Sequence, residues 1–155
     1  MLQSESISNG ISSKGEHMKN RPGLKQYIFA ALGVVILVLL DQYTKLLAIA
    51  HLKDQSAFVL WNNVFELHYL ENRGAAFGIF QNQRWFFVIM TVVILVVVSW
   101  FYGRTPVEKR YLPLRICRIV LTAGAIGNFI DRLTRGYVVD FFYFSLIDFP
   151  IFNVA

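Results

Sequence analysis

The chain has 155 residues, of which 55% are hydrophobic and 16% charged, and its formal net charge is +5. Soluble domains carry about 25% charged residues, so this composition excludes an ordinary soluble domain and indicates one small unit embedded in a membrane. The basic residues are scattered around apolar runs, which is typical of membrane topology, and we expect no nucleic-acid partner. The single cysteine, Cys117, excludes an internal disulfide, and its position in an apolar helix predicts a small buried hydrophobe.

Residues 1–24 are polar, rich in Ser, Gly and Asn, and have no apolar face. A segment of this kind buries too little apolar surface to fold, which predicts a disordered tail. Met18 is an alternative start to Met1, because the chain would then open with a basic flank of Lys19, Arg21 and Lys25. Basic flanks stay on the cytoplasmic side, so we expect the N-terminus and this tail to be cytoplasmic.

The first apolar run, Tyr27–Leu40, is predicted to continue as a helix to about residue 47. About 20 helical residues cross a bilayer, so Asp41 and Lys45 fall in the last turns, at the outer face. They are one turn apart with the acid first, which favours an ion pair. A cleaved signal peptide with an A-x-A site at 48–50 is the rival interpretation, but charged residues separate that site from the apolar run.

The segment 52–84 is predicted to lie outside the membrane. Phe65, Leu67 and Tyr69 alternate with polar residues, which is the periodicity of a strand. Two glycines in the following block 71–78 allow the chain to turn. We expect a small sheet or cradle on the membrane surface, with paired edges that satisfy backbone groups.

Two further spans are predicted at about 85–102 and 113–131. Aromatic residues flank the first, as at the two interfaces of a bilayer. The second contains small residues at a spacing that lets another helix pack closely, namely Ala123, Gly124 and Gly127. The remaining segment, 132–155, is again outer. The predicted fold class is an all-α polytopic membrane protein with three transmembrane helices and a small outer-face β cradle.

This topology brings polar side chains from four segments to one side of the membrane: Asp41, Lys45, Asn72, Arg73, Asn128, Asp131, Arg132 and Asp140. A transport path would place acids near mid-membrane or on both sides, so the pattern favours a one-sided interfacial site. The structural alternatives are ion pairs for Asp41–Lys45 and Asp131–Arg132, a turn for Asn72 and Arg73, and an interhelical hydrogen bond for Asn128. The three histidines share no ligand spacing, so we expect no metal and no cofactor. Ser56 and Ser145 have no neighbouring base that would mark a nucleophile.

Asp140 differs from the other acids because its neighbours are all apolar. It lies between two valines at 138–139 and two phenylalanines at 141–142. Burial of an unpaired carboxylate costs several kcal/mol unless the group keeps its proton. Strongly perturbed carboxyl groups gather at functional sites, so Asp140 is the leading candidate for a catalytic residue.

Several ordered blocks give the chain a family resemblance: D-Q-Y-T-K at 41–45, E-N-R-G-A-A-F-G at 71–78, G-N-F-I-D-R at 127–132, G-Y-V-V-D-F at 136–141 and F-N-V-A at 152–155. From about residue 24 to its end the chain resembles the lipoprotein signal peptidases, the type II signal peptidases of bacteria. The resemblance implies residues 25–155 as a peptidase domain with four transmembrane helices in the cytoplasmic membrane and a site at the outer face. It also implies an aspartic-type endopeptidase that removes signal peptides from prolipoproteins, cutting before a diacylglyceryl-modified cysteine. Its partners would be these precursors and membrane lipid.

The resemblance assigns Asp140 to the first catalytic position. In the family the F-N-x-A block is followed at once by the second catalytic aspartate, whereas this sequence ends at Ala155. We therefore expect a truncated member, without the fourth helix and inactive as written, with Ala155 close to Asp140. Asp131 and Asp148 are nearby acids, but neither matches the partner's motif.

Other matching positions are expected to bind substrate or support the site: Asp41, Lys45, Asn72, Arg73, Asn128, Asp131, Arg132 and Asn153. A second hypothesis is a non-enzymatic membrane subunit or a fragment of a proton-coupled carrier. It predicts that Asp140 lies deep in the membrane, away from Asn72, Arg73 and Asn128.

Overall fold

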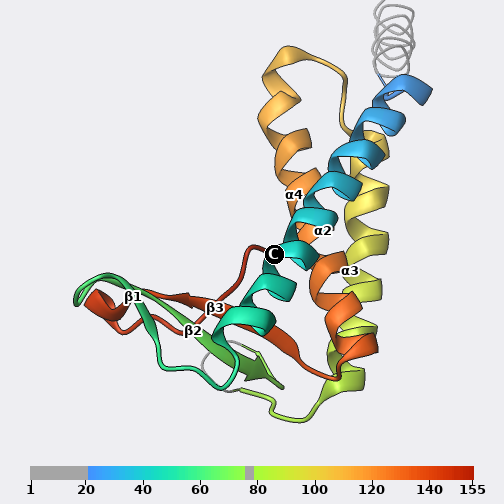
Figure 1. Ribbon diagram of the computed structural model, residues 1–155. Helices are drawn as coiled ribbons and strands as arrows, with labels where there is room; N and C mark the ends of the chain where they lie inside the picture. The colour runs from blue at the N-terminus through green and yellow to red at the C-terminus, as the bar shows by residue number, and fades with distance from the viewer. Residues whose placement is uncertain (1–20, 76–78) are drawn as a thin grey trace, which may run out of the picture.

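The computed structural model describes residues 21–75 and 79–155, and Figure 1 shows a helical bundle from one end of which a small sheet projects. Met18 and most of the predicted tail lie outside the described residues, as do positions 76–78 of the predicted turn. The elements in chain order are α2 (Leu24–Leu52), β1 (Phe58–Trp61), β2 (Phe65–Asn72), α3 (Arg84–Arg104), η2 (Lys109–Tyr111), α4 (Leu112–Thr134), β3 (Val138–Tyr143) and η3 (Ser145–Ile147).

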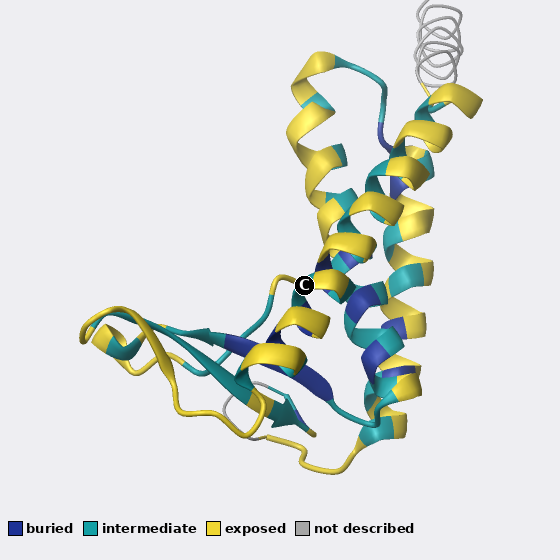
Figure 2. Ribbon diagram, viewed as in Figure 1, coloured by how far each residue is buried: buried dark blue, intermediate teal, exposed yellow. Residues whose placement is uncertain are grey.

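In the described part of the chain, α2, α3 and η2–α4 are each long and apolar enough to cross a membrane. Only 6% of the apolar window of α2 and 11% of each of the other two windows are buried within the protein. Figure 2 accordingly shows exposed positions along the whole bundle. Helices that are apolar and yet exposed indicate a lipid surrounding. The predicted fold class, a polytopic helical membrane protein with a small sheet, is confirmed.

One expectation about a single residue is wrong. Cys117 is exposed on α4, although the sequence predicted a buried hydrophobe. The reason is that lipid, rather than a protein core, can supply the apolar surrounding of a membrane helix. Among its neighbours on α4, Ile116 and Val120 are 50% and 53% exposed.

Small residues of α4 mark two close contacts, and only one of them is with a helix. At Gly127 a side chain would collide with the carboxylate of Asp41, so α2 and α4 meet here as the spacing predicted. At Gly124 the neighbour is instead the end of the chain, where an added Cβ would be 2.8 Å from the carbonyl carbon of Ala155. Glycine at these two positions thus admits a polar side chain and a backbone segment to the surface of α4.

The sheet has the order β1-β2-β3, and both pairings are antiparallel. The alternation in β2 predicted this strand correctly. Its partner β3 follows two intervening helices, and the register places Leu70 opposite Asp140. Ala48 of α2 packs with Val139 and Phe141 of β3 in a buried cluster. This cluster fixes the sheet to the end of α2, so the middle of β3 lies beside the polar ends of α2 and α4.

Candidate active site

Asp140 lies in the middle of β3 and is only 3% exposed. Its Oδ2 accepts a hydrogen bond from Nδ2 of Asn72 at 2.8 Å, and its Oδ1 accepts one from Nδ2 of Asn153 at 2.5 Å. Asn72 ends β2 and Asn153 belongs to the segment after η3, so two separate parts of the chain hold one carboxyl group. Both donors are neutral amides.

Burial raises the pKa of Asp140 above the ordinary value of an aspartate. The hydrogen bonds from Asn72 and Asn153 act in the opposite direction, as do the charges of Lys45 and Arg132, but they do not cancel the effect of burial. The apolar neighbours in the sequence predicted this shift. A carboxyl group of this kind holds its proton at a higher pH than a carboxyl group in water does.

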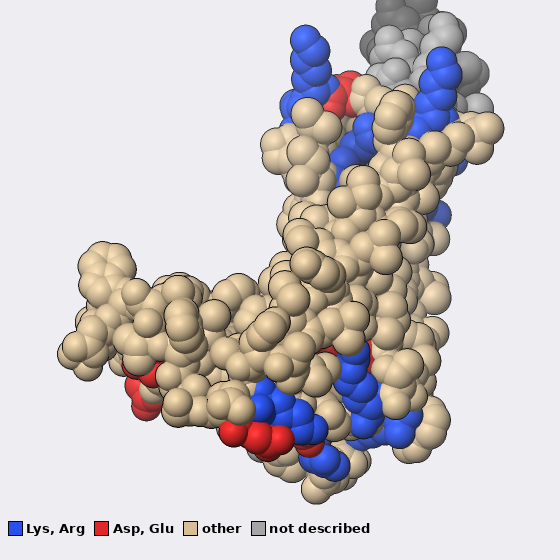
Figure 3. All heavy atoms as spheres, viewed as in Figure 1, with Lys and Arg blue, Asp and Glu red and all other residues tan. Residues whose placement is uncertain are grey.

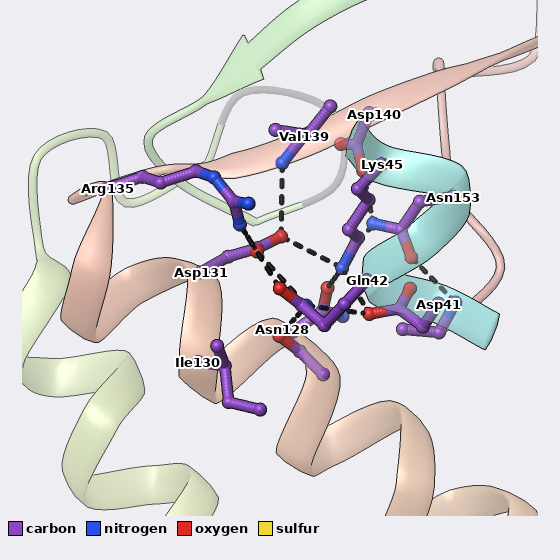
Figure 4. A network of polar contacts seen from close by, with 12 residues as sticks. Asp41, Gln42, Lys45, Asn128, Ile130, Asp131, Arg135, Val139, Asp140 and Asn153 are labelled. Carbon is purple, nitrogen blue, oxygen red and sulfur yellow. Dashed lines mark hydrogen bonds and ion pairs between the residues drawn. The ribbon is translucent and has the colours of Figure 1, made fainter. Parts of the chain in front are cut away.

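A buried ion network lies next to this group, at the contact between α2 and α4 (Figure 4). Nζ of Lys45 is 2.9 Å from Oδ2 of Asp41 and 2.9 Å from Oδ2 of Asp131, and the three side chains are 0–3% exposed. The same nitrogen donates to Oδ1 of Asn128 at 3.0 Å. An ammonium group has three donors, so each hydrogen of Lys45 has an acceptor. The predicted pair of Asp41 with Lys45 is confirmed.

Asp131 pairs with Lys45 and Arg135, and the interpretation of an Asp131–Arg132 pair is wrong. Adjacent residues of a helix point in different directions, whereas residues four apart share a face. Arg132 instead reaches Gly74 after β2, where its Nη2 donates to the backbone oxygen at 3.3 Å. Its guanidinium lies over the ring of Phe87, 4.6 Å from the centroid.

Asn128 and Asn153 connect the ion network to Asp140. Oδ1 of Asn128 accepts from Lys45 and also from Nδ2 of Asn153 at 3.3 Å, and this amide also donates to Asp140. Oδ1 of Asn153 accepts the backbone N–H of Ala155 at 2.7 Å. Ala155 is therefore one side chain away from Asp140, as the sequence predicted.

Arg73 is the predicted site residue that lies outside this arrangement. Its Nη2 bonds Oε2 of Glu71 at 3.1 Å, its guanidinium is 5.5 Å from the ring centroid of Tyr137, and its side chain is 54% exposed.

Sequence reasoning missed Gln42 and Arg135. The amide of Gln42 bonds both Asp41 and Asp131, and Arg135 bonds Gln42 as well as Asp131. The four-residue spacing from Asp131 to Arg135 was the signal that could have identified this pair.

These features define the class of protein: a membrane protein of several spans with a hydrogen-bonded carboxyl group buried at one end of its bundle. The family model described as "Signal peptidase (SPase) II" matches residues 33–155. The chain is 40% identical to a lipoprotein signal peptidase of Lactococcus lactis subsp. lactis over 122 residues, which are 79% of each chain. It is 42% identical to that of Brevibacillus brevis over 129 residues, which are 83% of each chain.

A solved structure described as a bacterial membrane enzyme superposes with a TM-score of 0.70 at 32% identity, covering 87% of this chain and 80% of that one. The chain belongs to the signal peptidase II family, and the resemblance given by its sequence blocks is confirmed.

Proposed function

We propose that this protein removes signal peptides from diacylglyceryl-modified prolipoproteins and cuts before the lipidated cysteine, by an aspartic mechanism in which Asp140 is one of two catalytic carboxyl groups. Family membership supports a peptidase, and the names of its relatives support lipoprotein precursors as substrates. One observation carries the mechanism. Asp140 is buried, and both of its oxygens are held by amide side chains at the end of a membrane bundle.

Peptide hydrolysis without a nucleophile from the protein needs a water, a base that takes its proton and an acid that assists the carbonyl group. Two close carboxyl groups share one proton and supply both states at one pH. Burial already favours the protonated form of Asp140. Asn72 and Asn153 would fix the plane of the carboxyl group, so that its proton and lone pair face the substrate.

The second carboxyl group is proposed to be the residue that directly follows Ala155 in the family's pattern. Within the described residues, Asp41 and Asp131 are both bound to Lys45, and Asp148 accepts from the hydroxyl of Tyr143 at 2.7 Å. None of them bonds to Asp140. Residues 1–155 assayed by themselves are then expected to be inactive, and a chain continued after Ala155 by an aspartate and a fourth apolar helix is expected to cleave.

The site's position suits a substrate that keeps its acyl chains in the bilayer while its scissile bond reaches the interface. At the end of the bundle opposite the sheet, the described residues include seven Lys and Arg but a single acid, Glu108. The sheet end has six cations and seven acids, and Figure 3 shows both signs of charge there. This bias supports a cytoplasmic N-terminus and an outer-face site in the bacterial cytoplasmic membrane.

The alternative of a non-enzymatic subunit or proton-coupled carrier fragment required Asp140 to lie far from Asn72 and Asn128. Asn72 bonds Asp140 directly, and Asn128 is linked to it through Asn153. These contacts favour the peptidase.

The test is cleavage of a lipidated precursor by the continued chain in proteoliposomes. Asp140→Asn is expected to lower turnover by at least about 100-fold, because an amide cannot exchange a proton with water or substrate. Asp148→Asn is the matched control, since it removes an acid that follows the same strand, and it is expected to keep turnover. Wild-type turnover in Asp140→Asn would overturn the mechanism.

A further inference from the structure

A pocket lies between the three helices in the half of the bundle away from the sheet. Its volume is about 260 Å³, and all three helices line it. The apolar part of the wall includes Ala31 and Val34 of α2, Val98 of α3 and Ile119 of α4. Pockets for compact small molecules usually have about 300–1,000 Å³. This smaller, mainly apolar space suits an apolar ligand of small volume, such as part of one acyl chain.

The pocket also carries a cation and two aromatic hydroxyls. Arg118 lines it together with Tyr27 and Tyr102, whose rings are 5.6 Å apart. Nη1 of Arg118 donates to the backbone oxygen of Phe101 at 2.8 Å and to the hydroxyl of Thr105. Within the described part of the chain, its Nη2 forms no hydrogen bond, so this nitrogen can serve a ligand.

A second guanidinium beside the pocket has an unpaired donor. Nη2 of Arg115 donates to the hydroxyl of Tyr102 at 2.9 Å, but Nε of Arg115 is buried without a hydrogen-bond partner. Arg115 does not line the pocket, so its contribution is to hold Tyr102, whose side chain forms part of the wall.

The charge at the end of the bundle opposite the sheet indicates the charge of the ligand's headgroup. Seven cations and one acid lie here among the described residues, and the acid, Glu108, is 2.9 Å from Nε of Arg110. Figure 3 shows Lys and Arg side chains gathered at this end of the bundle. A positive excess beside an intramembrane pocket matches an anionic headgroup whose chain enters the pocket.

We propose that this pocket binds one acyl chain of an anionic phospholipid, with the phosphate against Arg118. The lipid belongs to the leaflet at the end opposite the sheet. The site is separate from the carboxyl groups of the sheet end, so the proposal stands or falls independently of the peptidase.

The experiment titrates the purified, delipidated protein with phosphatidylglycerol and with phosphatidylcholine of the same acyl chains, and native mass spectrometry counts the bound molecules. We expect one tightly held phosphatidylglycerol and much weaker binding of phosphatidylcholine. Arg118→Gln is expected to weaken phosphatidylglycerol binding about tenfold, which is the worth of one charge-assisted hydrogen bond. Arg110→Gln is the charge-matched control, because Arg110 is at the same end but does not line the pocket.

A second pair of variants tests the chain-binding part without changing charge. Ala31→Phe fills the pocket and is expected to abolish tight binding, whereas Leu32→Phe, at a neighbouring exposed position outside the pocket, is expected to keep it. Equal binding of the two lipids overturns the proposal, as does equal weakening by Arg118→Gln and Arg110→Gln. If Arg118→Gln fails to fold, the Ala31 and Leu32 pair decides, and equal binding in those two variants also overturns it.

Discussion

Asp131 and Asp140 are nine positions apart in the sequence, and both are buried, but their partners differ in kind. Asp131 is bound by the cations Lys45 and Arg135. Asp140 is bound by the neutral amides of Asn72 and Asn153. Cations hold a carboxylate in its charged form, whereas burial between neutral donors leaves the proton able to come and go.

We propose that this difference gives the two acids different tasks. A buried carboxylate between two cations joins α2 to α4, because removal of either partner leaves an uncompensated charge. A buried carboxyl group without a direct cation is a poor structural link, and the raised pKa of Asp140 fits the proton-transfer role that we propose for it. Hydrogen bonds through Asn128 and Asn153 link the ion network around Asp131 to Asp140. The rigid network thereby helps to fix the position of the Asp140 carboxyl group.

The largest expected effect is on the stability of the protein, through the buried ion network around Asp131. Lys45→Met removes the cation shared by Asp41 and Asp131 and should lower the free energy of unfolding by about 3–5 kcal/mol. Thermal unfolding in detergent and the amount of protein in the membrane measure it. Lys53→Met is the control, since Lys53 is 3.6 Å from Glu71 at a partly exposed position, and a surface pair of this kind is worth about 0–1 kcal/mol. Equal effects of the two variants would show that the buried network does not hold the helices.

The next prediction concerns the contact that lets the network form. Gly127→Ala introduces a methyl group against the carboxylate of Asp41 and should destabilise the protein by about 1–3 kcal/mol, as overpacking does. Ala123→Gly on the same helix removes one buried methyl group and introduces a poorer helix former, and should cost about 2 kcal/mol. A variant Gly127→Ala as stable as the wild type would show that α2 and α4 can separate without loss.

The sequence predicted those features that depend on local periodicity or on a familiar block. The apolar runs gave the helices, the alternation in 65–69 gave β2, and the apolar neighbours of Asp140 gave its burial and raised pKa. The pairing of β2 with β3 could not be derived from periodicity, since two membrane helices separate these strands and nothing local encodes their register.

The errors have equally physical causes. Asp131 and Arg132 are adjacent in the sequence but diverge on the helix, so adjacency was a poor guide to an ion pair. Cys117 faces outward because lipid replaces a protein core around α4. Arg73 was grouped with Asn72 because they share a block, yet successive residues at a strand end point to opposite faces. Only Asn72 of the two bonds Asp140.

The contrast between residues that bond Asp140 and Arg73, which does not, predicts a smaller effect on catalysis. Asn153→Ala removes one hydrogen bond to Asp140 and the link to Asn128, and it should lower turnover of the continued chain about tenfold while leaving the Michaelis constant nearly unchanged. Arg73→Ala removes only a contact with Glu71 and a ring and should change turnover less than twofold. The reverse order of the two effects would place the reacting carboxyl group near Arg73, away from Asn153.

The smallest expected effect is a pH dependence of stability that belongs to Asp140. Its pKa is raised in the folded protein, so the folded state binds more protons than the unfolded chain. The resulting stabilisation is complete below the unfolded pKa, about 3.9, and is lost as the pH rises through the folded pKa.

Asp140→Asn removes this contribution, so the melting temperature of the variant should fall less steeply than that of the wild type as the pH rises from about 4. Asp148→Asn is the control, because it removes an acid that lies at an exposed position. A steeper fall in Asp140→Asn would mean that folding lowers the pKa of this carboxyl group, and the contrast between the two acids would be lost.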